Sequence, residues 1–323
     1  MEEHNEKIDL TPFTEKISQL KNAIGSVIVG QERSIELILT AILARGHVLI
    51  EGVPGVAKTL LAKMIAKLIN ANYSRIQFTP DLMPSDVLGT SVYNMKTSEF
   101  NFHPGPVFAD IILVDEINRA PAKTQSALFE VMEERQATID GILHKMSPIY
   151  TILATQNPIE QEGTYKLPEA QLDRFIMKIT ISYPSPEEEL EILERHNQNT
   201  HIAKLENITP VISREDMQDL LGYVEKVYIE KSLIIYITSV IQLTRRNNTF
   251  YLGASPRASI ALLQASKAMA LLQGRDFVTP EDIKKVAPFI LQHRLILTAE
   301  AEMEGHTPFK IVQRLLDRIE VPK

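Results

Sequence analysis

A glycine-rich loop lies between an apolar run and an amphipathic helical pattern near residue 55. The run His47 to Ile50 is short and apolar, the loop covers Gly52 to Thr59, and apolar residues recur at helical spacing from Lys58 to Asn70. A strand, a loop and a helix in this order can surround a phosphate with backbone N–H groups and a helix N-terminus. This unit favours an α/β fold over all-α and all-β classes.

Further β-rich runs follow this unit, and helix-like stretches such as Pro121 to Glu134 separate them. The runs are Ser74 to Phe78, Asp110 to Val114, Ile149 to Ala154 and Phe175 to Thr180. Strands that alternate with helices predict a parallel, doubly wound sheet. A helical lead-in from Leu20 to Arg45 is expected before it.

The pattern changes after about Tyr183, where no convincing strand remains and helix starts become frequent. Helix-start signals occur at Ser185, Ser213, Ser255 and Thr279. A hydroxyl at the N-cap, often with proline next and an acid three residues on, is typical of a helix N-terminus. At 323 residues, the chain has room for two domains. We therefore predict a nucleotide-binding α/β domain at 1–184 and a helical domain at 185–323.

The glycine-rich loop is close to the P-loop pattern. Its residues are Gly52, Val53, Pro54, Gly55, Val56, Ala57, Lys58 and Thr59. In that pattern the lysine reaches the β and γ phosphates and the hydroxyl binds Mg²⁺. Ala57 stands where the general pattern has glycine, so we predict a negative φ there. The alternative is a tight turn with an incidental Lys-Thr pair.

Two acids follow the apolar run Ile111 to Val114. Asp115 is positioned to hold Mg²⁺, and Glu116 to orient and polarise the attacking water. Asn157 follows the run Ile149 to Thr155, so its side chain is expected near the γ-phosphate. The alternatives are solvated loop acids and an Asn-Pro turn.

Taken together, several segments resemble the MoxR family of AAA+ ATPases. They are 28–32, 52–59, 78–86, 115–120, 154–158, 167–175 and 253–258, in the family's order. The resemblance implies an AAA+ P-loop αβα sandwich with a mostly parallel sheet, followed by a smaller all-α helical lid. It also accounts for Ala57, which belongs to the family's version of the loop.

The same resemblance implies roles for individual residues. Ile28, Val29 and Gly30 would border the adenine, and the nucleotide site would extend through the loop to Leu60. Asn157 is similar to sensor 1, Arg174 to the arginine finger that acts on a neighbouring subunit, and Arg257 to sensor 2 on the lid. Arg119 and Arg135 are alternative interface arginines. Arg174 could instead form an ion pair with Asp173 or Glu169, and Arg257 could be an ordinary surface arginine.

The function implied by the resemblance is Mg²⁺-dependent ATP hydrolysis by a hexameric, cytoplasmic ring. Such proteins act as chaperones on partner proteins, often ones with von Willebrand factor A domains. The alternatives are a DNA-acting motor and a nucleotide-gated scaffold without turnover. A net charge of -7 makes nucleic acid an unlikely partner. The absence of cysteine agrees with a reducing compartment.

Three further features bear on partners. Ser91 to Phe102 and Gln136 to Lys145 each read as an inserted hairpin, although their aromatic and turn residues could be ordinary packing. The apolar run Ser232 to Leu243 is too short to span a membrane, which needs about 20 residues. The polar segment Met1 to Asp9 lacks the features of a secretory signal. No histidine spacing indicates a metal other than Mg²⁺.

Overall fold

The computed structural model describes residues 10–53, 55–157, 165, 167–197 and 208–320. Its centre is a five-stranded sheet in the order β2-β5-β8-β1-β9, and every neighbouring pair is parallel. The strands are β1 (Val48–Gly52), β2 (Tyr73–Gln77), β5 (Ile111–Asp115), β8 (Thr151–Gln156) and β9 (Met177–Ile181). The predicted parallel α/β sheet is therefore confirmed.

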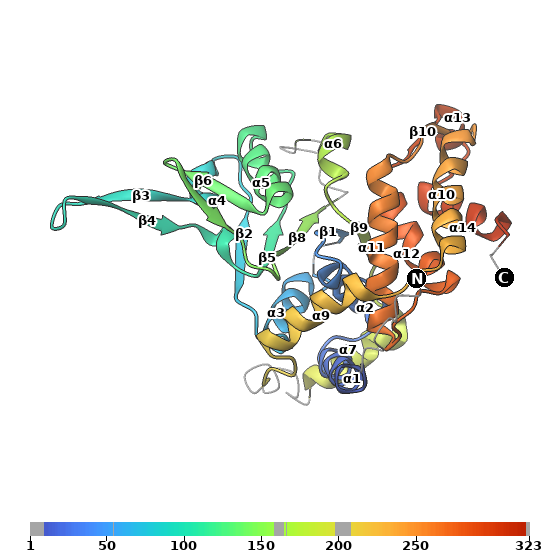
Figure 1. Ribbon diagram of the computed structural model, residues 1–323, viewed down its shortest axis with the longest axis horizontal. Coiled ribbons are helices and arrows are strands. Elements are labelled where there is room, and N and C mark those ends of the chain that lie inside the picture. Colours follow the sequence, from blue (N-terminus) through green and yellow to red (C-terminus); the bar gives the residue numbers. More distant parts are fainter. Residues whose placement is uncertain (1–9, 54, 158–164, 166, 198–207, 321–323) are drawn as a thin grey trace, which may run out of the picture.

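The sheet is buried on both faces because alternate residues of its strands point to opposite sides. Along β5, Ile111 and Leu113 belong to one apolar core, and Ile112 and Val114 belong to the other. Helices cover the sheet in Figure 1. The helices of this half are α1 (Thr11–Gly25), α2 (Glu32–Leu43), α3 (Lys58–Leu68), α4 (Pro84–Leu88), α5 (Ala122–Glu134) and α6 (Glu169–Leu172). The predicted helical lead-in is present as the two helices α1 and α2.

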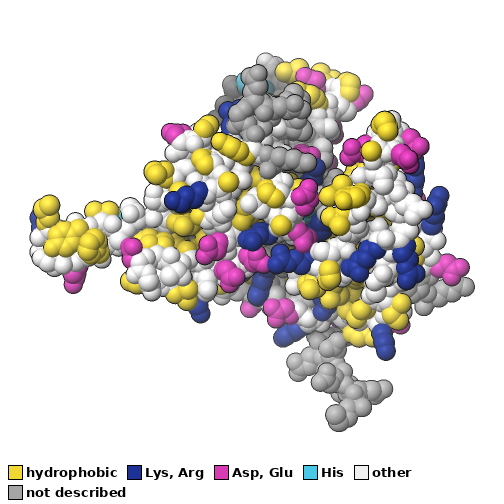
Figure 2. All heavy atoms as spheres, turned by 90° about the horizontal axis from the view of Figure 1, so that it is seen from above, with side chains coloured by type: hydrophobic (Ala, Val, Ile, Leu, Met, Phe, Trp, Pro, Cys, Tyr) yellow, Lys and Arg dark blue, Asp and Glu magenta, His cyan; other side chains and the backbone are white. Residues whose placement is uncertain are grey.

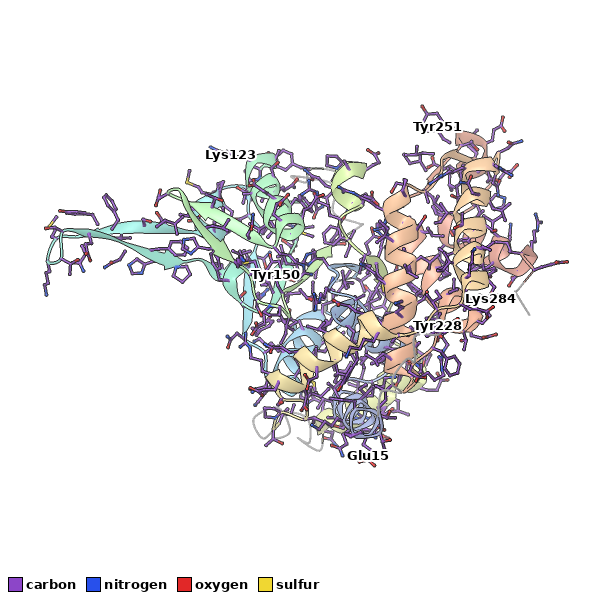
Figure 3. All side chains as sticks on the ribbon, viewed as in Figure 1. Glu15, Lys123, Tyr150, Tyr228, Tyr251 and Lys284 are labelled. Carbon is purple, nitrogen blue, oxygen red and sulfur yellow. The ribbon has the colours of Figure 1, made fainter. Side chains whose placement is uncertain are left out.

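Both predicted hairpins are present. The first pairs β3 (Gly89–Asn94) with β4 (Glu99–Pro104) and extends far from the body (Figure 1). Figure 3 shows its side chains standing clear of the rest of the molecule. The second pairs β6 (Gln136–Ile139) with β7 (Ile142–Lys145). Asp140 and Gly141 at its turn have φ of 51° and 80°, as a two-residue hairpin turn requires.

The C-terminal half is helical, as predicted, with one exception. Its helices are α7 (Pro186–Asn197), α9 (Arg214–Lys226), α10 (Lys231–Arg246), α11 (Pro256–Leu272), α12 (Pro280–Leu291), α13 (Ala299–Met303) and α14 (Pro308–Arg318). The exception is a small antiparallel pair, β10 (Phe250–Leu252) and β11 (Ile296–Leu297). These strands are too short to show period-2 alternation, which is why the expectation of no strand was wrong.

Three of the four predicted helix starts have hydroxyl caps. Ser185, Ser213 and Thr279 each take part in reciprocal contacts with the acid three residues on. Ser255 begins α11, but its hydroxyl instead donates a hydrogen bond to Asp173 Oδ2 at 3.1 Å. The helical half is therefore tied to the α/β half at that point. Among the described residues, no helix is long and apolar enough to cross a membrane.

The two halves share one apolar core. Helix α11 packs against α2, and α12 packs against β9. The imidazole Nε2 of His293, after α12, lies 2.9 Å from the carbonyl oxygen of Phe175. The N-terminal half has its own buried groups, including Tyr150, which lies within this half in Figure 3 and is fully buried. The packing of the helical half against α2 and β9 thus fixes the position of the sheet relative to these helices.

Candidate functional site

The C-terminal ends of the central strands bring the predicted functional residues to one edge of the sheet. Gly52 ends β1, Asp115 ends β5, and Asn157 directly follows β8. In parallel sheets, ligands bind outside this edge. Strands β1 and β5 flank β8, so their polar ends are neighbours.

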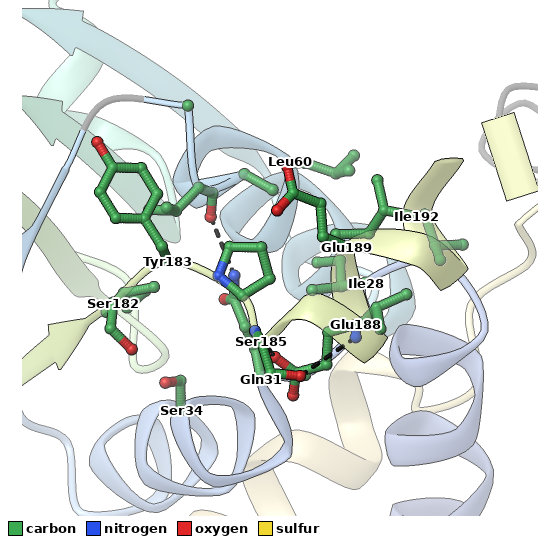
Figure 4. A pocket seen from close by; sticks show the side chains of 18 of the residues that line it. Ile28, Gln31, Ser34, Leu60, Ser182, Tyr183, Ser185, Glu188, Glu189 and Ile192 are labelled. Carbon is green, nitrogen blue, oxygen red and sulfur yellow. Dashed lines mark hydrogen bonds between the residues drawn. The ribbon is translucent and has the colours of Figure 1, made fainter. Parts of the chain in front are cut away.

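A cavity of about 760 Å³ lies beside this edge (Figure 4). This volume suits a ligand of nucleotide size, because ligand sites span roughly 300–1,000 Å³. The predicted nucleotide-binding residues that line it are Ile28, Val29, Gly30, Gly55, Val56, Ala57 and Leu60. Gly52, Val53, Lys58 and Thr59 adjoin it along the chain, whereas Pro54 lies outside the described residues.

Helix α7 forms another wall of the cavity, which sequence reasoning missed. Glu188, Glu189 and Ile192 line it from this helix (Figure 4). Glu188 lies so close to Gly30 that a Cβ there would come within 2.3 Å of its carboxyl group. The signal in the sequence was the helix start at Ser185, directly after the last core strand. That start predicts the beginning of the second domain, but it does not by itself indicate a wall of the cavity.

The backbone at Ala57 corrects the prediction of a negative φ. Ala57 has φ 57° and ψ 23°, which is left-handed, and it is the N-cap of α3. The expectation was wrong because the helix begins at Lys58 rather than at Ala57. Gly55 also has a positive φ, of 87°. The loop therefore bends through two left-handed residues before it enters the helix.

The side chain of Lys58 extends back across the loop that precedes α3. Its ammonium group donates a hydrogen bond to the carbonyl oxygen of Gly52 at 2.8 Å. Partial burial lowers the pKa of Lys58, while the charges of Asp115 and Glu116 act to raise it. The lysine is thus electrostatically coupled to both acids. Thr59 follows in the first turn of α3 and is half-buried.

Asp115 is held at both carboxylate oxygens. Oδ1 accepts a hydrogen bond from Thr155 Oγ1 at 3.1 Å, and Oδ2 accepts one from Arg75 Nε at 2.6 Å. Asp115 is only 8% exposed, so its negative charge needs these donors. The hydrogen bond to Asp115 raises the pKa of Arg75.

Glu116 is connected to the same network. Its Oε2 accepts a hydrogen bond from Gln77 Nε2 at 2.9 Å and lies 3.0 Å from Arg119 Nε. Arg75 in turn donates to Gln77 Oε1 at 3.2 Å. Sequence reasoning missed Arg75 and Gln77. The signal was their alternation with Ile76, which places both polar side chains on one face of β2.

The donor set fits Mg²⁺. A hydroxyl at Thr59 and a carboxylate at Asp115 are hard oxygen ligands, and Mg²⁺ takes one or two such protein groups together with phosphates and water. The guanidinium of Arg75 on Asp115 shows that this carboxylate accommodates a cation. Asn157 is half-buried at the same edge of the sheet.

Arg174 and Arg257 do not lie at this cavity. Arg174 Nη2 lies 3.0 Å from Glu133 Oε2, and Arg257 Nη2 lies 2.5 Å from Glu133 Oε1. Both arginines line a second cavity of about 270 Å³. The ion-pair alternatives for Arg174 were wrong in their partner, since Asp173 binds Arg294 instead.

The two alternative arginines have other partners. Arg135 donates hydrogen bonds to the carbonyl oxygens of Tyr150, at 3.2 Å, and Arg45. Burial lowers the pKa of Arg135. Arg119 forms an ion pair with Glu116, at the carboxyl end of β5. Arg135 also lines the second cavity, but among the three candidates Arg174 is the one whose ion pair is with Glu133, the carboxylate that also binds Arg257 of the helical half.

Comparison with known proteins gives consistent matches. Residues 47–177 match the ATPase family associated with various cellular activities (AAA), and residues 242–315 match the AAA lid domain. Protein YeaC of Bacillus subtilis is 49% identical, covering 93% of this chain and 92% of that protein. Chaperone MoxR1 of Mycobacterium tuberculosis is 44% identical, covering 93% and 81%. A crystal structure from Cytophaga hutchinsonii, described as an ATPase, has a TM-score of 0.89 at 42% identity and covers 98% and 97% of the chains.

Proposed function

Because this chain belongs to the MoxR family of AAA+ ATPases and hydrolyses ATP, we propose that it does so as a Mg²⁺-dependent ring that remodels partner proteins. The observation that carries the proposal is the edge of the sheet where Lys58, Asp115 and Glu116 lie together. Beside it is the cavity bordered by Ile28, Val29 and Gly30. Because the chain hydrolyses ATP, the alternative of a nucleotide-gated scaffold without turnover does not apply.

Each residue at this edge has a distinct task in the proposed reaction. Lys58, which holds the Gly52 carbonyl oxygen, would exchange that partner for the β and γ phosphates. Glu116 would orient the attacking water, and Asn157 would contact the γ-phosphate. Thr59 and Asp115 would hold Mg²⁺, which neutralises charge that develops on the phosphates. We place the lid that closes over this domain at 185–323.

The ring is supported by the position of the two arginines. Arg174 and Arg257 line a cavity other than the one that the P-loop borders. A guanidinium aimed at transition-state charge is worth roughly 10³–10⁵ in rate. We therefore propose that both serve the nucleotide of a neighbouring subunit in a homo-oligomeric, hexameric ring. Arg257 would then act across the interface rather than on its own nucleotide.

Protein clients are favoured over DNA by the β3–β4 hairpin. Figure 2 shows apolar side chains gathered at its far end. Val92, Tyr93, Met95 and Phe100 are exposed there, Met95 by 88%. A DNA-acting hairpin would need a basic tip, and Lys96 alone does not make one. We propose that the clients are cytoplasmic proteins with von Willebrand factor A domains, as the family resemblance implies.

The ring is tested by mixing two variants, Lys58→Ala and Arg174→Ala. Each alone should hydrolyse ATP slowly. A mixture should regain activity because a pocket from the second variant meets an arginine from the first. If both variants assemble and the mixture stays inactive, Arg174 does not act between subunits.

The client class needs its own measurement. Steady-state ATP hydrolysis is followed while a purified von Willebrand factor A domain protein or single-stranded DNA is added. We expect stimulation by the protein only. Stimulation by DNA, with a steep loss as salt is raised, would favour the DNA-acting alternative.

A further inference from the structure

One carboxylate joins two arginines that come from different halves of the chain. Glu133 lies in the last turn of α5, Arg174 follows α6, and Arg257 lies in the first turn of α11. Glu133 Oε2 contacts Arg174 Nη2 at 3.0 Å, and Oε1 contacts Arg257 Nη2 at 2.5 Å. Each oxygen of the carboxylate therefore serves a different guanidinium.

The surroundings of Arg174 give it a second support that does not depend on Glu133. Arg174 also donates a hydrogen bond to the carbonyl oxygen of Phe129, and its guanidinium lies 6.0 Å from the centre of the Phe129 ring. Both of these contacts come from α5. Glu133 thus adds a contact that sets the direction of Arg174 Nη2, a nitrogen that Phe129 does not bind. Through Arg257, Glu133 also links this nitrogen to the helical half.

Arg257 depends on Glu133 to a greater extent. Its side chain is 56% exposed, against 27% for Arg174 and 35% for Glu133. A long, exposed side chain samples many rotamers unless a partner restrains it. Two neighbouring guanidinium groups repel each other, and a carboxylate between them offsets this repulsion. Glu133 supplies both the restraint and the opposite charge.

The loop that carries Arg174 is tied to the helical half at the adjacent residue. Asp173 accepts hydrogen bonds from Ser255 at 3.1 Å and from Arg294 at 2.6 Å. Arg294 is almost fully buried, so this connection is part of the core. A movement of the helical half would therefore be transmitted to residue 173 directly, and to the Arg174 side chain through Glu133 and Arg257.

We propose that Glu133 is a positioning residue for ATP hydrolysis. It holds Arg174 and Arg257 as a pair, so that the two halves of one subunit present both guanidiniums together to the neighbouring subunit's nucleotide. This role rests on the proposed action of Arg174 between subunits. Misplacing a catalytic group by about 1 Å can cost roughly 10²-fold in rate. We therefore expect the loss of Glu133 to lower kcat by about 10- to 100-fold.

The test compares Glu133→Gln with Glu134→Gln. Glutamine keeps the shape of the side chain but removes the charge that both arginines share. Glu134 is the next residue on α5; it is exposed and makes no ion pair with the residues that the structure describes. Glu133→Gln should lower kcat while the affinity of its own cavity for ADP, measured by calorimetry, stays within twofold. Glu134→Gln should leave both quantities near those of the unmodified protein.

Two further measurements separate positioning from damage to the fold. Glu133→Asp, which keeps the charge on a shorter arm, should recover part of kcat. Mixing Glu133→Gln with Lys58→Ala should restore activity. The Lys58→Ala subunit supplies a correctly held arginine pair, and the Glu133→Gln subunit supplies an intact nucleotide pocket.

The results that would overturn the proposal are distinct from one another. If the Lys58→Ala and Arg174→Ala mixture regains activity but Glu133→Gln keeps a normal kcat, Glu133 has no positioning role and the proposed ring is unaffected. If Glu133→Gln lowers ADP affinity as much as kcat, its role is structural. If the Lys58→Ala and Arg174→Ala mixture stays inactive, the proposed ring mechanism is wrong, and the role of Glu133 falls with it.

Discussion

The left-handed backbone at Ala57 predicts that Ala57→Gly stabilises the protein. At φ 57° and ψ 23°, a residue with a Cβ is disfavoured by about 1–2 kcal/mol relative to the right-handed region, whereas glycine is not. Glycine also raises the conformational entropy of the unfolded chain, and this lowers the gain in stability by about 0.5–1 kcal/mol. The net expected gain in the free energy of unfolding is about 0.5–1 kcal/mol.

Thermal unfolding followed by calorimetry measures this gain. With an unfolding entropy of about 2.1 cal/mol/K per residue over 323 residues, a gain of this size raises Tm by about 0.7–1.5 °C. The matched control is Ala127→Gly, a half-buried position inside α5 with ordinary helical backbone. Glycine inside a helix costs about 1 kcal/mol, so the control should lower Tm by a similar amount.

The two substitutions are chemically identical, so their opposite signs isolate the backbone conformation. If Ala57→Gly lowers Tm as Ala127→Gly does, residue 57 has the negative φ that its sequence context suggested. The reasoning from the left-handed backbone would then be refuted. Measuring both variants without nucleotide keeps ligand stabilisation out of the comparison.

Three further predictions concern Glu116, the Arg75 partner of Asp115, and the buried His47. Glu116→Gln should still bind ATP in calorimetry but release phosphate about 10²–10⁴-fold more slowly, since it loses the group that orients water; near-normal turnover would exclude that role. Arg75→Gln should raise the affinity for Mg²⁺-ADP about two- to fivefold, because a half-exposed ion pair of about 0.5–1 kcal/mol no longer competes for Asp115; unchanged or weaker binding would contradict this competition. Burial lowers the pKa of His47 from 6.5 to about 3. The unfolded chain therefore takes up a proton below pH 6.5 that the folded chain refuses, and the free energy of unfolding falls as pH drops through that window, by up to about 1.4 kcal/mol per pH unit. Urea unfolding at several pH values gives the free energy of unfolding as a function of pH, and this free energy should fall less steeply with decreasing pH for His47→Gln than for the unmodified protein. An equally steep fall in both proteins would contradict the assignment.

Much of the fold could be predicted because its signals are local. Every predicted core strand is present within a few residues of its expected place, and Asp140-Gly141 alone indicated the second hairpin. The apolar runs that end in Gly52 and Asp115 also placed both residues at one edge of a parallel sheet. Such predictions succeed because a strand's alternation and a turn's backbone depend on neighbours in the chain.

The errors arose where conformation depended on distant contacts. The short β10–β11 pair forms only because Phe250 meets Leu297. Glu188 reaches Gly30 because α7 returns to the wall of the cavity. The left-handed conformation of Ala57 depends on where α3 begins. No periodicity in the sequence reports these arrangements.

The sequence by itself determined the chemistry of the nucleotide site, because a phosphate loop and a strand that ends in two acids are built from residues adjacent in the chain. The tertiary structure alone decided which surface each arginine serves. Arg257 meets Glu133 across 124 positions in the sequence, and only the packing of α11 against the α/β half brings them together. A guanidinium is long and flexible, so its partner is chosen by the elements that surround it and not by its neighbours along the chain.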